Sequence, residues 1–146
     1  MPENLDAAFS LLKLQCEGAL GTLEGECPFV SAVGYLYEKS TGPEDLGKIY
    51  FLLSDLARHT KNLRVNSQAS LLVVEDDEAP IHEKKRLSLQ GKVVLTNGKL
   101  EKLKSEYFKV FPKSGIFFTL ADFHFYEMAI SEIHWIGGFG KVATFR

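Results

Sequence analysis

Residues 51–73, FLLSDLARHTKNLRVNSQASLLV, decide the fold. The stretch begins with an apolar, strand-type run that ends at Ser54. Residues 55–66 then place Leu56, Ala57 and Leu63 at helical spacing, and residues 68–76 return to a strand pattern. The chain therefore passes from a strand into a short helix within about two residues and back into a strand.

The rest of the chain shows the same mixture of short strands and short helices. An amphipathic helix is predicted over 4–15 with Asn4 as its N-cap, and a hairpin over 19–39 turns at Gly25. The other predicted elements are strands at 48–54 and 85–96, a helix at 100–111, and a final pair of strands in 122–145 divided at Gly137 and Gly138.

The composition is that of one folded domain spanning residues 1–146. The chain is 45% hydrophobic and 25% charged, and its eleven Phe and five Tyr fall largely in short alternating runs. Six or seven antiparallel strands with three short helices predict a mainly β (α+β) fold, a small closed or nearly closed barrel.

Charge and cysteine content narrow the class of protein. The net charge of −2 gives no general attraction to nucleic acid or anionic lipid, and no apolar run approaches the roughly 20 residues that cross a bilayer. Cys16 and Cys27 form no CxxC pair, and the first apolar stretch is interrupted by charges. We expect a cytoplasmic protein that binds neither nucleic acid nor membrane.

The junction after Ser54 has the features of an anion site. Arg58 and His59 fall near the start of the predicted helix, where unpaired N–H groups and the helix dipole favour negative charge. A guanidinium can also hold a phosphate with two hydrogen bonds. The alternative from pattern alone is that Ser54 and Asp55 cap the helix and Arg58 pairs with Asp55 on the surface.

Three segments in order carry a family resemblance: 51–73, RLSLQG at 86–91, and DFHFYEMAISEIHWIGGFGKV at 122–142. From about Leu11 to Phe145 the chain resembles the FMN-binding split barrels of the pyridoxamine 5'-phosphate oxidase-like superfamily. The resemblance implies a six- to seven-stranded antiparallel split β-barrel with Greek-key connections and short flanking helices. It also implies a homodimer with the cofactor at the interface.

The resemblance assigns a phosphate-binding role to several of these residues. By position, Arg58 and His59 would bind the FMN phosphate, while Ser54 and the backbone around Leu52 and Leu53 would line the same ligand. His59 stands where Lys or Arg is more usual, so we expect FMN affinity to depend on pH.

Other positions matched by the resemblance belong to the flavin ring or to the partner. Arg86 would reach the flavin from the other subunit, and Lys141 stands where relatives have a substrate-binding Arg. Ser31 replaces a basic residue of the true oxidases, so this strand would contribute the Ser31 hydroxyl or only backbone around Ala32 and Val33.

The substrate element of the true oxidases is altered. Their Tyr-x-x-x-Arg-Pro-x-x-Ser pattern corresponds to Tyr107, Phe111, Pro112 and Gly115, so two phosphate donors are missing. We therefore expect an FMN-binding protein, an oxidoreductase of unknown substrate, that does not oxidise vitamin B6.

The haem-utilisation branch of the superfamily is the closer match, through SDLARHTKNL, KKRLS, DFHFY and GGFG. A haem-binding protein without flavin chemistry is therefore the alternative. His124 and His134 are interpreted as solvent-facing or hydrogen-bonded residues and Trp135 as core. No metal site is predicted, and the catalytic residues stay unassigned.

Overall fold

The computed structural model describes residues 3–39 and 41–146. One sheet of eight strands dominates it, with three α-helices and two 3₁₀ segments. The elements are α1 (Glu3–Leu14), β1 (Glu17–Glu24), β2 (Cys27–Gly34), β3 (Leu36–Glu38), β4 (Lys48–Ser54), α2 (Arg58–Val65), β5 (Gln68–Val74), η1 (Ile81–Glu83), β6 (Lys85–Leu95), α3 (Leu100–Val110), η2 (Pro112–Thr119), β7 (Phe123–Gly137) and β8 (Val142–Phe145).

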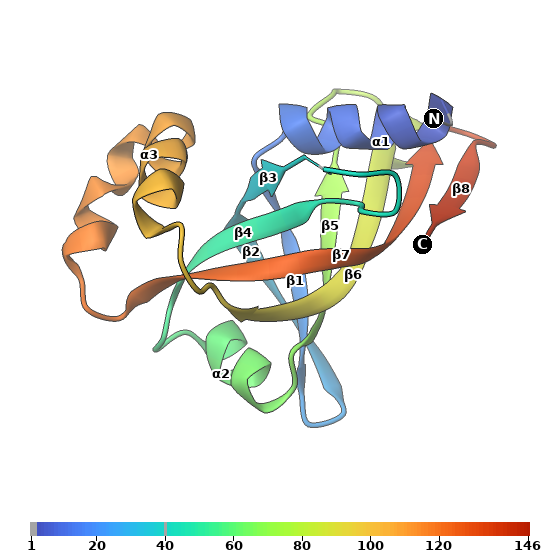
Figure 1. Cartoon of the computed structure of the whole chain (residues 1–146). Coiled ribbons are helices and arrows are strands. Elements are labelled where there is room, and N and C mark those ends of the chain that lie inside the picture. The colour runs from blue at the N-terminus through green and yellow to red at the C-terminus, as the bar shows by residue number, and fades with distance from the viewer. Residues whose placement is uncertain (1–2, 40) are drawn as a thin grey trace.

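The sheet curls into an open barrel. Its strand order is β2-β1-β5-β6-β7-β4-β3, with β8 paired to the C-terminal part of β7, and neighbouring strands of the described residues pair antiparallel. The two end strands, β2 and β3, are separated only by Tyr35 in the chain. The sheet must therefore bend round on itself (Figure 1).

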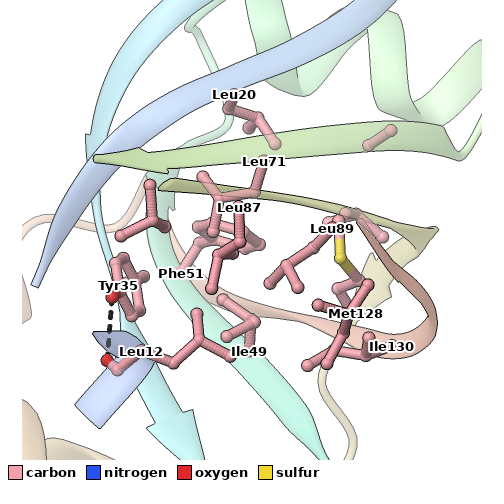
Figure 2. Packing of buried hydrophobic residues seen from close by; sticks show 14 of the residues in the cluster. Leu12, Leu20, Tyr35, Ile49, Phe51, Leu71, Leu87, Leu89, Met128 and Ile130 are labelled. Atoms are coloured by element: carbon pink, nitrogen blue, oxygen red, sulfur yellow. Dashed lines mark hydrogen bonds between the residues drawn. The ribbon is translucent and has the colours of Figure 1, made fainter. Parts of the chain in front are cut away.

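Apolar side chains from the alternating positions of the strands fill the barrel. Leu20, Phe51, Leu71 and Leu89 are buried at its centre (Figure 2). Helix α1 lies across one end of the barrel (Figure 1) and buries Ala8, Leu11 and Leu12 against this core. The Tyr35 hydroxyl donates to the Leu12 carbonyl over 2.8 Å and fixes the helix to the sheet.

A second, smaller apolar cluster lies on the outer face of β3, β4 and β7, under α3 and η2. Tyr107 is its centre, with the Phe111 ring at 4.6 Å and the Phe125 ring at 5.7 Å between centroids. Offset and edge-to-face contacts of this kind add to the burial of the rings. The cluster attaches α3 to the barrel at the left of Figure 1.

The structure confirms the fold class and corrects its details. The second strand of the hairpin predicted over 19–39 is divided at Tyr35, which gives eight strands instead of six or seven. The helix predicted from residue 55 begins at Arg58, because residues 55–57 form a turn. Trp135 is 1% exposed, so its assignment to the core is confirmed. Within the described residues, none of the helices has the length and apolarity to cross a membrane.

Candidate functional site

Two side-chain hydrogen bonds attach helix α2 to the sheet. The Thr60 hydroxyl donates to the Ser54 carbonyl over 2.6 Å, and the Asn62 amide donates to the Thr22 hydroxyl over 3.1 Å. Both Thr60 and Asn62 are buried. These two contacts fix the start of α2 between the end of β4 and the β1–β2 hairpin (Figure 1).

Ser31 of β2 and His59 of α2 form a pair beside the start of the helix. The Ser31 Oγ and His59 Nδ1 atoms lie 2.9 Å apart. Burial lowers the pKa of His59 below its usual value. The N-cap residue of α2 is Ala57, which provides no side-chain cap, and the first turn carries no acidic residue. The N–H groups of that turn are therefore available to an anion.

Arg58 is close to this pair and is held by Glu24 at the end of β1. Its Nε donates to Glu24 Oε2 over 2.6 Å and a terminal nitrogen donates to Oε1 over 3.1 Å. The guanidinium also lies 4.4 Å from the centre of the Phe29 ring. The bidentate hydrogen bond from Arg58 lowers the pKa of Glu24. The surface pairing of Arg58 with Asp55 considered above is therefore wrong.

The three residues of β4 that were expected to line the cofactor lie in different surroundings. Leu53 is buried in the barrel core, whereas Leu52 lies on the outer face. The Ser54 hydroxyl donates to Asp122 Oδ2 over 2.7 Å and accepts from the Leu56 N–H over 3.1 Å. Its partners thus belong to the turn after β4 and to the residue before β7.

Asp55 is the centre of a polar network that the sequence interpretation missed. Its carboxylate lies 2.9 Å from His124 Nδ1 and 3.1 Å from an Arg64 nitrogen, and it accepts a hydrogen bond from the Tyr126 hydroxyl over 3.0 Å. Burial alone would raise the pKa of Asp55, but these hydrogen bonds and positive charges lower it overall. The network joins the turn before α2 to the first residues of β7.

A cavity of about 270 Å³ opens beside His124, between α3, η2 and the outer face of β4, β6 and β7. Leu52, Phe118 and Phe125 provide apolar walls, and Lys104 is a basic residue at its edge. The cavity lining includes neither Ser31 nor His59. The candidate phosphate site and this cavity are therefore separate features, joined through Ser54 and Asp55.

Arg86 and Lys141 lie at the opposite end of the barrel from α2. Strand β5 begins at Gln68, soon after the end of α2, and Gln68 pairs with Lys92 of β6. Arg86 lies six residues further along β6 from Lys92. At about 3.3 Å per residue this is roughly 20 Å. The Arg86 guanidinium donates to the backbone carbonyls of Ile81 and Lys84. Within one chain the structure does not bring Arg86 or Lys141 to the Ser31–His59 pair.

Of the remaining predicted positions on β2, Ala32 is exposed and Val33 packs partly against the core.

His134 is hydrogen-bonded, with its Nδ1 2.9 Å from Thr144 Oγ1, and His124 contacts Asp55, which confirms their interpretation as hydrogen-bonded residues. One signal for the missed network was present. His124 and Tyr126 are two residues apart on a strand and therefore share a face.

Comparisons with known proteins agree with this architecture. A family model described as "CREG, beta-barrel" matches residues 6–145. No curated protein matches the chain. A haem-binding protein from Mycobacterium smegmatis superposes with a TM-score of 0.83 at 22% identity, over 99% of this chain and 58% of its own length.

Two further solved structures share the fold. The haem storage protein HutZ of Vibrio cholerae has a TM-score of 0.71 at 20% identity, over 96% of this chain and 92% of HutZ. An FAD-binding protein from Mesorhizobium loti has a TM-score of 0.65 at 19% identity, over 87% of each chain. At these identities the likeness establishes the fold.

Proposed function

Because the chain belongs to the CREG β-barrel family of the pyridoxamine 5'-phosphate oxidase-like superfamily, we propose that it binds FMN, with the cofactor's phosphate between β2 and the start of α2. The observation that carries this proposal is the 2.9 Å contact between Ser31 and His59, beside Arg58 and the start of a helix that has no side-chain cap. It brings a hydroxyl, an imidazole and a guanidinium to one helix N-terminus.

Each of these groups has a defined task toward a phosphate. Arg58 would donate two parallel hydrogen bonds, as it does to the Glu24 carboxylate. His59, in its protonated form, would donate to a phosphate oxygen while Ser31 holds the ring in place. The true oxidases have a cation at the position of Ser31. In this chain Ser31 would instead orient the cationic ring of His59. Flavin supplies hydride and one-electron transfer when it is bound.

Glu24 fits this proposal as a stand-in for the ligand. Its carboxylate holds the guanidinium of Arg58 in the geometry that a phosphate oxygen pair would use. Both side chains are substantially exposed, at 62% for Arg58 and 48% for Glu24, so their pairing is weak and can be exchanged for a ligand.

We propose a homodimer in which the partner completes the site. Arg86 lies six residues, roughly 20 Å, along β6 from Lys92, the residue that pairs with the start of β5 just after α2. Lys141 lies near Arg86, because its carbonyl accepts from the N–H of Gly137, the partner of Lys85. The partner's copies of these two side chains, facing the flavin across the interface, would explain how they can share one site. A cytoplasmic location fits such a protein.

Oxidation of vitamin B6 is not part of the proposal. In the true oxidases the Phe111 position is an Arg that binds the substrate phosphate. Here Phe111 packs on Tyr107, and its ring lies over Gly34, where an added Cβ would come within 2.8 Å. An aromatic cluster therefore occupies the region in which a second phosphate would need a cation. The substrate of the flavin is a different molecule.

Haem is the second candidate ligand, because the neighbours from M. smegmatis and V. cholerae are named for it. Absorption spectra after gel filtration separate the two. Retained flavin absorbance supports FMN, whereas a Soret band after haem addition, without retained flavin, contradicts it. Uptake of neither ligand contradicts both.

Titration of the apoprotein with FMN tests the residue assignment. We expect Arg58→Ala to weaken FMN binding more than about tenfold, since it removes a charge-assisted, bidentate contact. Lys61→Ala removes an equally exposed positive charge from the same helix and should leave the affinity nearly unchanged. Equal losses in the two variants would reject a specific role for Arg58.

A further inference from the structure

The cavity beside His124 is a second feature with the properties of a ligand site. We propose that it binds a small carboxylate with an aromatic or branched aliphatic body, independently of the flavin site. Its volume of about 270 Å³ lies just below the usual range of about 300–1,000 Å³ for ligand pockets. A molecule much smaller than FMN or haem would fill it.

The walls of the cavity define the body of the ligand. They are mostly apolar and come from strands β4, β6 and β7 on one side and from α3 and η2 on the other. The apolar residues are Leu52, Leu95, Leu100, Leu103, Phe118, Phe123 and Phe125. Such a lining removes apolar surface of a ligand from water and offers ring faces for stacking.

The charged residues of the lining define the head group. Lys104 and His124 are the basic members, and none of the described lining residues is acidic. Lys104 has a distant contact with Glu101, at 4.0 Å between Nζ and Oε1, and its Nζ lies 6.0 Å from the centre of the Phe118 ring. Its ammonium group is therefore available to an anion over an apolar wall.

The His124 side chain lies on the same face of β7 as Tyr126, opposite to Phe123 and Phe125, and Asp55 holds it there. An ionised carboxylate only accepts hydrogen bonds, so the 2.9 Å contact with Asp55 makes Nδ1 the donor. His124 thus contributes to the wall of the cavity, while Lys104 and Thr96 provide the polar groups that can meet the carboxylate of a ligand. Tyr126 and Arg64 hold Asp55 from its other oxygen, so the ring is fixed by a rigid neighbour.

The Thr96 side chain gives an independent indication. Its hydroxyl is buried without a hydrogen-bond partner among the described residues, and Thr96 lines this cavity. Its backbone N–H, by contrast, is bonded to the Phe125 carbonyl over 2.9 Å. A buried hydroxyl left unpaired costs free energy, and a ligand oxygen within the cavity would satisfy it.

Ligand-observed ¹⁹F NMR with 4-fluorobenzoate tests the proposal on the intact chain. We expect saturable binding, and competition by benzoate but not by benzyl alcohol, which has the same ring without the charge. Lys104→Met should weaken binding at least fivefold, while Lys102→Met, which removes a charge from the same helix outside the cavity, should not.

A second variant keeps the test valid if Lys104→Met disturbs the helix. Thr96→Val replaces the hydroxyl by a methyl group of similar size, so it should weaken 4-fluorobenzoate binding without lowering the melting temperature. Arg58→Ala should leave this binding unchanged, which separates the cavity from the flavin site. Absence of saturable binding, equal affinity for benzyl alcohol, or equal losses in the two lysine variants would overturn the proposal.

Discussion

Arg58 and Glu24 are 34 positions apart in the chain, yet the guanidinium of one and the carboxylate of the other form a two-point contact at 2.6 and 3.1 Å. This contact joins the first turn of α2 to the end of β1. A ligand phosphate that takes the same nitrogen atoms must first displace the Glu24 carboxylate. The free protein thus carries its own competitor for the anion site.

Replacement of this competitor is the first prediction. Glu24→Gln should bind FMN about two- to fivefold more tightly than the wild type, because it releases Arg58 and removes a negative charge beside the phosphate. The measurement is a fluorescence titration of the apoprotein. Glu26→Gln removes a charge from the same hairpin turn and serves as the control. A weaker affinity in Glu24→Gln would mean that Glu24 positions Arg58 for the ligand.

The second prediction concerns pH. Burial lowers the pKa of His59 in the free protein, so the ring is largely neutral near pH 7. A phosphate dianion favours the protonated ring and raises that pKa in the complex. FMN binding then takes up a proton, and affinity falls as the pH rises between the free and bound pKa values.

Titrations at several pH values between about 6 and 8.5 check this dependence. In His59→Gln the fall should disappear, while the Lys61→Ala variant should keep it. Because FMN is the same in all three titrations, ionisation of its own phosphate cannot explain a difference between them. A flat affinity in the wild type would contradict a role for His59.

The third prediction tests the packing of the barrel. Gly91 lies at the irregularity between β6 and β7, and a Cβ there would lie 2.5 Å from the Ala129 carbonyl oxygen and 2.6 Å from a Met128 carbon. Gly91→Ala should therefore destabilise the fold by about 1–3 kcal/mol. At Gly21 an added Cβ meets only ordinary contacts at 3.7 Å, so Gly21→Ala should change stability much less. Urea unfolding of both variants provides the comparison.

The fourth prediction concerns Asp55. Its pKa is lowered in the folded state, so its contribution to stability is present above the unfolded pKa, near 4, and is lost as the pH falls through the folded value. Asp55→Asn should lower stability at pH 7 by about 1 kcal/mol or more, because His124, Tyr126 and Arg64 lose a charged acceptor.

The same change should flatten the acid side of the stability profile. In Asp55→Asn the loss of stability on acidification should be smaller than in the wild type, since the ionising group is gone. Asp77→Asn, in an exposed loop, is the matched control and should retain the wild-type profile. Parallel profiles for all three proteins would contradict the assigned role of Asp55.

Sequence periodicity predicts much of this fold because its cause is local. Alternation of Arg86 and Ser88 with Leu87 and Leu89 places one set inside the barrel whatever the neighbouring strands are. Helix α2 begins three residues later than its pattern predicts, because the Ser54 hydroxyl accepts from the Leu56 N–H and forms a turn instead of a cap. The local sequence at Ser54 is compatible with either a turn or a helix cap.

The arrangement of the site depends on contacts that periodicity does not encode. The partner of Arg58 is set by the curl of the β1–β2 hairpin toward α2, and no residue near Arg58 identifies Glu24. Similarly, the spacing between α3, η2 and the sheet around the cavity is set by Tyr107 and Phe118, whose rings both pack on Phe125 of β7. The family resemblance assigns Ser31 and His59 to one cofactor site, but it does not predict their direct contact.

The short turn from Ser54 to Ala57 separates the carboxylate that orients His124 from the guanidinium of Arg58. Asp55 contacts His124, a residue of the cavity lining, and Arg58 lies in the proposed flavin site. Thermodynamic linkage requires that any coupling transmitted by the turn be reciprocal. If a carboxylate bound in the cavity changes the affinity for FMN by some factor, bound FMN must change the affinity for that carboxylate by the same factor. A titration with either ligand, in the presence of the other, therefore measures the coupling.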